Sequence, residues 1–193
     1  MGSLVLTGNT SGSVTVAVPD VAGSNTATIG AATGTHYPFT ASAVVTASTQ
    51  TAIEFSAIPS WVKRITIMLS GLSTNNTGTP LVQLGTGSTT YTTSGYLSAT
   101  TILGASTLAT ANFTSGFAIT NNHAAAYLIG GNIVLTNLTG NTWSCSGNTS
   151  TSSTTANFVT AGSVPLGATL TAIRLYIDGT QQFDAGSVNI LFE

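Results

Sequence analysis

Charged side chains are scarce in this chain of 193 residues. Three residues are Lys or Arg and five are Asp or Glu, which makes 4% of the sequence, against about 25% in an average soluble protein. None lies between Ile65 and Ile173, so more than half of the chain offers only His123 and Cys145 for proton transfer or metal binding near neutral pH. Catalytic and metal sites usually gather several titratable groups. The sequence therefore argues against an enzyme, and it predicts neither a cofactor nor a metal site.

Positive charge is too sparse for binding to phosphate groups. Lys63, Arg64 and Arg174 are the only basic residues, and the net charge is −2. A protein that binds nucleic acid neutralises several phosphates with Lys or Arg, so nucleic acid is not an expected partner. No run approaches the roughly 18 apolar residues of a membrane-spanning helix, so a membrane is not expected either. A nearly uncharged surface favours association with other proteins.

Cysteine and histidine are equally sparse. Cys145 is the only cysteine, so no disulfide can form within the chain, and a buried structural thiol is its expected state. Neither His36 nor His123 has a cysteine or carboxylate neighbour at the spacing of a zinc site. We interpret both histidines as loop or packing residues.

Alternation of apolar and small polar residues runs through the chain. It is clearest over residues 13–18 (SVTVAV), and Thr, Val, Ile and aromatic residues dominate the similar segments. These segments are short, Gly, Ser and Asn separate them, and helical periodicity is hard to find. This pattern predicts an all-β fold, an antiparallel β-sandwich or jelly roll with an N-terminal β-arm. A composition shift near residues 30–38 divides the arm, residues 1–35, from the sandwich domain, residues 36–193.

The arm requires a partner, because its side chains are almost all small. Val14, Val16 and Val18 can form only a narrow apolar strip on one face of their strand. An exposed Thr- and Val-rich strand pairs readily with other chains, and neighbouring copies in a symmetric assembly would cover it. We therefore predict that these valines contact other subunits or a capsid.

Three further features carry local predictions. Asp178-Gly179 between alternating runs predicts a β-hairpin with a type I′ turn over residues 173–183. The polar segment 140–157 predicts an exposed hairpin or loop that displays Trp143. Glu54 alternates with apolar neighbours, and a cross-strand ion pair with Lys63 or Arg64 is its expected use.

Several segments of the chain resemble a family of tailed-bacteriophage and prophage virion proteins. They are residues 58–68 (IPSWVKRITIM), Gln83-Leu84-Gly85 and Ser94-Gly95-Tyr96. The ending is similar too, with Asp178-Gly179-Thr180 followed by residues 183–193 (FDAGSVNILFE). Residues 6–16 (LTGNTSGSVTV) look like an N-terminal attachment segment of phage head and tail appendages.

The resemblance implies a non-enzymatic structural protein of a virion, made in the host cytoplasm and located on the virion exterior. The first hypothesis is a homotrimeric capsid decoration (cement) protein that contacts the major capsid protein or other virion proteins. It would stabilise the head by binding only the assembled shell.

Two alternatives stay open. One is a tail-fibre or receptor-binding module that contacts host glycans through exposed Tyr91, Tyr96 and Trp143, because aromatic rings pack on sugars. Core packing is the more common role of such aromatics. The other is a carbohydrate-processing enzyme that uses Glu54 and Asp184, the weakest of the three hypotheses.

Overall fold

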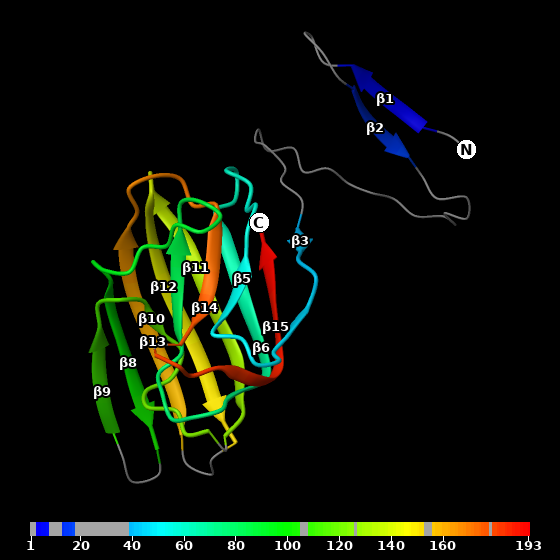
Figure 1. The fold of residues 1–193 in the computed structure, drawn as a ribbon. Helices are drawn as coiled ribbons and strands as arrows, with labels where there is room; N and C mark the ends of the chain where they lie inside the picture. The colour runs from blue at the N-terminus through cyan, green and yellow to red at the C-terminus, as the bar shows by residue number, and fades with distance from the viewer. Residues whose placement is uncertain are drawn as a thin grey trace. The chain divides into compact units, whose positions relative to one another are not determined.

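The computed structural model describes residues 3–7, 13–17, 39–104, 108–125, 127–152, 156–177 and 179–193. Contacts divide the chain into two units, residues 1–36 and residues 37–193. In the first unit, β1 (Ser3–Thr7) and β2 (Ser13–Ala17) form an antiparallel pair of their own. Figure 1 shows the two strands as blue arrows.

The second unit contains two antiparallel sheets packed face to face (Figure 1). The larger sheet has the order β3-β15-β6-β11-β12-β13-β8-β9, and β4 also pairs with β15. Its strands are β3 (Thr40–Ala41), β4 (Val45–Thr46), β6 (Arg64–Thr74), β8 (Leu97–Leu103), β9 (Leu108–Phe113), β11 (Ile129–Thr139), β12 (Thr142–Thr151), β13 (Asn157–Pro165) and β15 (Phe183–Phe192).

The smaller sheet has the order β10-β7-β14-β5. Its strands are β10 (Phe117–Ala118), β7 (Leu81–Gly85), β14 (Ala172–Tyr176) and β5 (Ala52–Phe55). No described residue is helical. The predicted all-β class and antiparallel β-sandwich are therefore confirmed.

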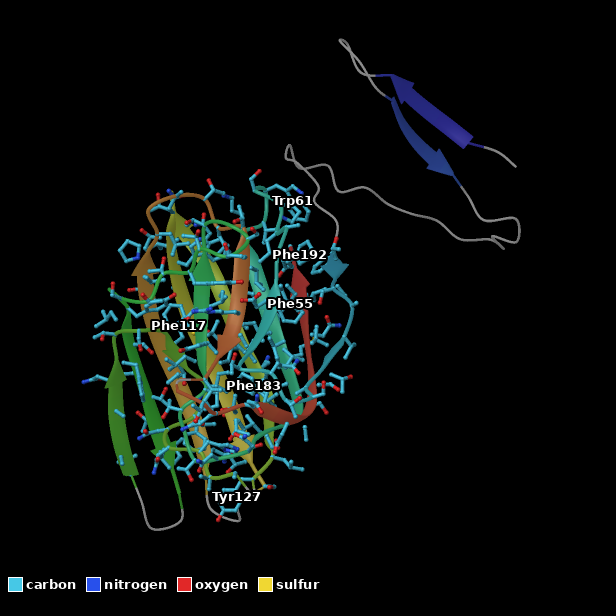
Figure 2. All side chains as sticks on the ribbon, in the orientation of Figure 1. Phe55, Trp61, Phe117, Tyr127, Phe183 and Phe192 are labelled. Carbon is cyan, nitrogen blue, oxygen red and sulfur yellow. The ribbon has the colours of Figure 1, made fainter. Side chains whose placement is uncertain are left out.

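The core lies between the sheets and follows the period-two pattern of the sequence. On β6, Ile65 and Ile67 are fully buried. Met68, the residue after Ile67, points to the outer face of the sheet and is partly exposed. Ile173 and Leu175 of β14 face them from the smaller sheet with no exposed surface. Burial of each such side chain contributes about 1.5–3 kcal/mol. Figure 2 shows Trp61 and Tyr127 at opposite ends of the sandwich.

Threonine hydroxyls replace aliphatic contacts where β10 packs on the larger sheet. The Thr100 and Thr160 hydroxyls both donate to the carbonyl of Ala118, at 3.1 and 2.7 Å, and lie 2.8 Å apart. The Thr149 hydroxyl donates to the carbonyl of Ile119 at 2.7 Å. Buried carbonyls without partners are costly, so these side chains connect the sheets where β10 is too short for a full ladder.

The hairpin predicted around Asp178-Gly179 is wrong. β14 pairs with β5 and β7 in the smaller sheet, and β15 pairs with β6 in the larger one. The chain thus crosses from one sheet to the other between these strands. Ile177 and Phe183 are both fully buried, so burial at the two ends of the crossing outweighs the local turn preference. Gly179 does have positive φ, 75°, and Asp178 lies outside the described residues.

The prediction of an exposed segment at residues 140–157 is also wrong. Most of this segment is β12, which lies between β11 and β13 near the middle of the larger sheet. Its polar residues alternate with Trp143 and Cys145, whose side chains are buried. Burial of one face is therefore enough to keep a Ser-, Thr- and Asn-rich strand inside a sheet.

Candidate functional site

One edge of the larger sheet is formed by β9, at the left in Figure 1. Among the described strands β9 pairs only with β8, in continuous register from Ser98↔Phe113 to Leu103↔Leu108. Residues 108–113 contain no charge and no proline, and the register has no bulge. Edge strands in soluble proteins are usually protected by one of these features, because their outer N–H and C=O groups can pair with another chain.

Apolar side chains lie exposed on the outer surface of the same strands and of neighbouring β13. We call Leu97, Leu103, Leu108 and Val159 the β9 face. Leu97 and Leu108 are 75% and 77% exposed, and Leu103 and Leu108 are direct cross-strand partners. Exposed apolar surface of this kind, next to an open edge, makes the β9 face a candidate contact surface.

The opposite edge of the sheet differs. There β15 is flanked by the short strands β3 and β4, and charged groups lie nearby. Arg64 forms a 3.1 Å ion pair with Glu193, and the Lys63 ammonium donates to the Asn137 side chain at 3.3 Å. The open, uncharged edge is therefore specific to the β9 side.

The predicted contact valines belong to the first unit. Val14 and Val16 lie in β2, opposite Leu6 and Leu4 of β1. Val18 lies outside the described residues. Contact between these valines and other subunits stays a prediction.

Two of the three predicted glycan-contact aromatics are core residues. Tyr96 and Trp143 are each 3% exposed. The hydroxyl of Tyr96 accepts the Leu84 N–H at 2.8 Å, and its ring packs edge-on against Phe117 with centroids 4.9 Å apart. Burial raises the pKa of Tyr96 to about 12. The expectation that Tyr96 and Trp143 are exposed is wrong, because both side chains fall on inward positions of the sandwich.

Tyr91 has a different environment, on the outer face of the smaller sheet. Its ring packs on the Arg174 guanidinium, 4.2 Å from Cζ to the ring centroid, and the Tyr176 ring packs on the same group at 4.5 Å. The Tyr91 hydroxyl is buried, and desolvation followed by the nearby Glu54 carboxylate raises its pKa to about 12. Such cation–π contacts fix a guanidinium and cost it little hydration.

Glu54 pairs with Arg174 and not with the predicted Lys63 or Arg64. The two residues are direct partners on β5 and β14, and Arg174 Nη1 lies 4.0 Å from Glu54 Oε1. The pairing is cross-strand, as predicted, but its partner depends on a strand order that the sequence does not reveal. Because the Glu54 side chain is 47% exposed, the pair contributes only a fraction of a kcal/mol.

Gln83 holds Arg174 from β7, the other neighbouring strand. Arg174 Nε donates to Gln83 Oε1 at 2.8 Å, and Gln83 Nε2 donates to the Ser115 carbonyl at 2.7 Å. Gln83 is almost completely buried. Beside this group lies a pocket of about 230 Å³, lined by Leu81, Gln83, Thr93, Ser115, Arg174 and Tyr176. No local sequence pattern marks this site, because its residues come from strands that are far apart in the sequence.

The remaining reactive groups are dispersed. Cys145 is a buried thiol whose pKa burial raises to about 12, so the predicted structural role is confirmed. His123 is buried against Tyr127, and His36 lies outside the described residues. Asp184 accepts a hydrogen bond from the Ser73 hydroxyl. Within the described ranges, no three His, Cys, Asp or Glu side chains are close enough to share a metal ion.

The described residues include no helix that is long and apolar enough to span a membrane. Comparison of the chain with protein-family models, with curated proteins and with solved structures found no match.

Proposed function

We propose that this chain is a non-enzymatic structural protein of a tailed-phage virion, and specifically a homotrimeric capsid decoration protein. The observation that carries the proposal is the β9 side, where an open strand edge adjoins an exposed apolar face without any charge. A protein that diffuses alone protects such an edge, whereas a protein with a fixed place in an assembly uses it for contact. The resemblance of the sequence to virion proteins supports the same function.

The N-terminal unit supports attachment to neighbours. A two-stranded hairpin is marginally stable by itself in water, and β1 and β2 form such a hairpin. Packing on another subunit would stabilise this hairpin by adding apolar contact. We assign the β9 face to contact between copies in the trimer, and the arm with Val14, Val16 and Val18 to the capsid.

Truncation of the arm tests this assignment. Removal of residues 1–20 should abolish attachment to capsids while the sandwich keeps its circular dichroism spectrum and melting temperature. A full-length variant, Val14→Asp with Val16→Asp, should also lose attachment, because it places charges in the apolar strip. Ser13→Asp with Thr15→Asp, at the alternate positions of β2, is the matched control and should still bind. Full occupancy of capsids by the truncated protein would reject the proposal.

A second proposal is the tail-fibre or receptor-binding module. Tyr96 and Trp143 are buried in the core, so two of the three aromatic residues predicted to contact glycans are not on the surface. The pocket beside Arg174 and the Tyr91 and Tyr176 rings is the observation that favours it. Electron microscopy of intact particles would separate the two proposals, because density on the capsid supports the first and density on the tail supports the second.

A further inference from the structure

We infer that the pocket beside Arg174 binds a sugar that carries a carboxylate. The inference concerns a binding site on the outer face of the smaller sheet, and it holds whether the protein sits on a capsid or on a tail. It is carried by a fixed guanidinium group in a pocket that is otherwise lined by three polar residues, one tyrosine and one leucine.

The guanidinium of Arg174 is positioned before any ligand arrives. Gln83 accepts its Nε–H from one neighbouring strand, while the Tyr91 and Tyr176 rings pack on it at 4.2 and 4.5 Å. Gln83 is itself fixed by its hydrogen bond to Ser115. Fixing these groups in advance reduces the entropy that ligand binding would otherwise lose.

The guanidinium still has donors to offer. Of its five N–H groups, the described residues accept one hydrogen bond, at Nε. Glu54 lies 4.0 Å from Nη1, beyond hydrogen-bond distance, and its side chain is about half exposed. Arg174 keeps 20% of its side chain exposed. A ligand carboxylate can therefore accept strong, charge-assisted hydrogen bonds from the Nη groups.

The size and lining of the pocket select a small polar ligand. Its volume of about 230 Å³ is below the roughly 300–1,000 Å³ of pockets for drug-sized molecules, and it suits one sugar ring. The Thr93 and Ser115 side chains can hydrogen-bond sugar hydroxyls, and Leu81 and the Tyr176 ring provide apolar contact. The Glu54 carboxylate is 4.0 Å away and accepts no hydrogen bond from the Nη groups, and only a ligand carboxylate would give them a charged acceptor at hydrogen-bond distance.

Titration of the full-length, ¹⁵N-labelled protein by NMR tests the inference. The probes are sialyllactose and glucuronic acid, with lactose, glucose and acetate as comparison ligands. Both acidic sugars should shift the Arg174 Nε–H signal and the amide signals of Thr93 and Ser115. They should bind at least tenfold more tightly than lactose and glucose, because a charged hydrogen bond is worth about 1.5–3 kcal/mol. They should also bind more tightly than acetate, which has the carboxylate but lacks the sugar ring and its hydroxyls.

Substitutions at Arg174 and at Glu54 should change the affinity for acidic sugars in opposite directions. Arg174→Gln should weaken binding at least tenfold, and Glu54→Gln should strengthen it by up to about fivefold, because it removes the competing carboxylate. Thr93→Tyr, at an exposed position on the pocket rim, should block binding without changing the packing of Arg174. Arg64→Gln, which removes the ion pair with Glu193, is the matched control and should bind as the wild type does.

Four results would overturn the inference. They are no shift of the pocket signals by either acidic sugar, equal binding of lactose or glucose, equal binding of acetate, and unchanged affinity in Thr93→Tyr. The last variant decides the matter even if Arg174→Gln fails to fold.

Discussion

The β15 side and the β9 side of the sandwich differ in the residues that point into the core. On the β15 side, the inward positions of β6, β11 and β14 are aliphatic and completely buried, as in Ile67, Ile133 and Ile173. On the β9 side, the inward positions of β8 and β13 include Thr100 and Thr160, which hydrogen-bond across the sheets. The first side has a covered edge and charges nearby, while the second has an open edge without charge.

This difference suggests that the two sides of the sandwich have different roles, with folding stability on the β15 side and an open contact surface on the β9 side. Aliphatic burial contributes most of the free energy of folding, so the β15 side should dominate the stability of the domain. Hydroxyl contacts add less net free energy but fix geometry, because each requires a particular distance and direction. The β9 side is therefore a well-defined surface on which another subunit can pack.

The largest expected effect is a cavity on the β15 side. Ile67→Ala should lower the free energy of unfolding by about 2–5 kcal/mol, because it removes buried methyl groups from a site that cannot collapse. Met68→Ala, the next residue on the outer face of β6, should cost much less. Urea unfolding followed by circular dichroism measures both. Equal losses for the two variants would show that the β15 side is not the centre of stability.

A smaller loss is expected from the β9 side. Thr160→Val keeps the shape of the side chain but removes the hydroxyl that donates to Ala118. Because Thr100 still donates to that carbonyl, the free energy of unfolding should fall by only about 1–2 kcal/mol. Thr101→Val, whose hydroxyl contacts Thr110 at the surface, should change it by less than about 0.5 kcal/mol. A loss for Thr160→Val as large as for Ile67→Ala would erase the contrast between the sides.

Acid should destabilise the β9 side through His123, which lines a pocket with Ile102 and Phe158. Burial lowers the pKa of His123 from 6.5 in the folded protein, with Tyr127 and Asp184 opposing the shift. Below pH 6.5 the unfolded chain therefore binds a proton that the folded chain does not. The free energy of unfolding should fall there by up to about 1.4 kcal/mol per pH unit.

The pH dependence is measured by thermal or urea unfolding between pH 7 and pH 5. His123→Phe should remove this part of the loss while it keeps the aromatic contact with Tyr127. All other titratable side chains are kept in the variant, so the difference between the two curves reports the loss of His123. Parallel curves would contradict the expected sign.

The smallest effect on stability is expected at the open edge. Thr110→Lys places a charge on β9, and it should change the free energy of unfolding by less than about 0.5 kcal/mol. It should nevertheless reduce self-association in sedimentation velocity, because edge lysines prevent strand pairing. Ser70→Lys, on the exposed outer side of β6, is the control and should leave the oligomer intact. An oligomer that persists in Thr110→Lys would remove the β9 side from the interface.

Local patterns predicted the fold class, and non-local pairing decided the rest. Alternation such as that of Ile65 and Ile67 predicted strands and the β-sandwich, because period two is a local property of the chain. The partners of Glu54 and Arg174 depend on the order β7-β14-β5, which joins segments far apart in sequence. Trp143 was misjudged because polar neighbours hide a buried face.

The candidate site could be predicted only in part. Tyr91 is half-buried and its role as a glycan contact stays a prediction, while its contact with Arg174 follows from tertiary packing. Gln83 appeared only as part of a matching segment, since nothing local distinguishes a buried glutamine that orients an arginine. Neither β9 nor its place at the open edge could be predicted, because residues 108–113 carry no clear period-two pattern and a sequence does not show the order of strands in a sheet.

The absence of charge on the β9 side determines how any complex formed there responds to solvent. Ion pairs weaken as sodium chloride screens them, but contacts among Leu97, Leu108 and backbone amides do not depend on charge. Sulfate salts should strengthen such an interface, and guanidinium chloride should weaken it. A particle held together in this way would survive dilution into fresh water or seawater alike.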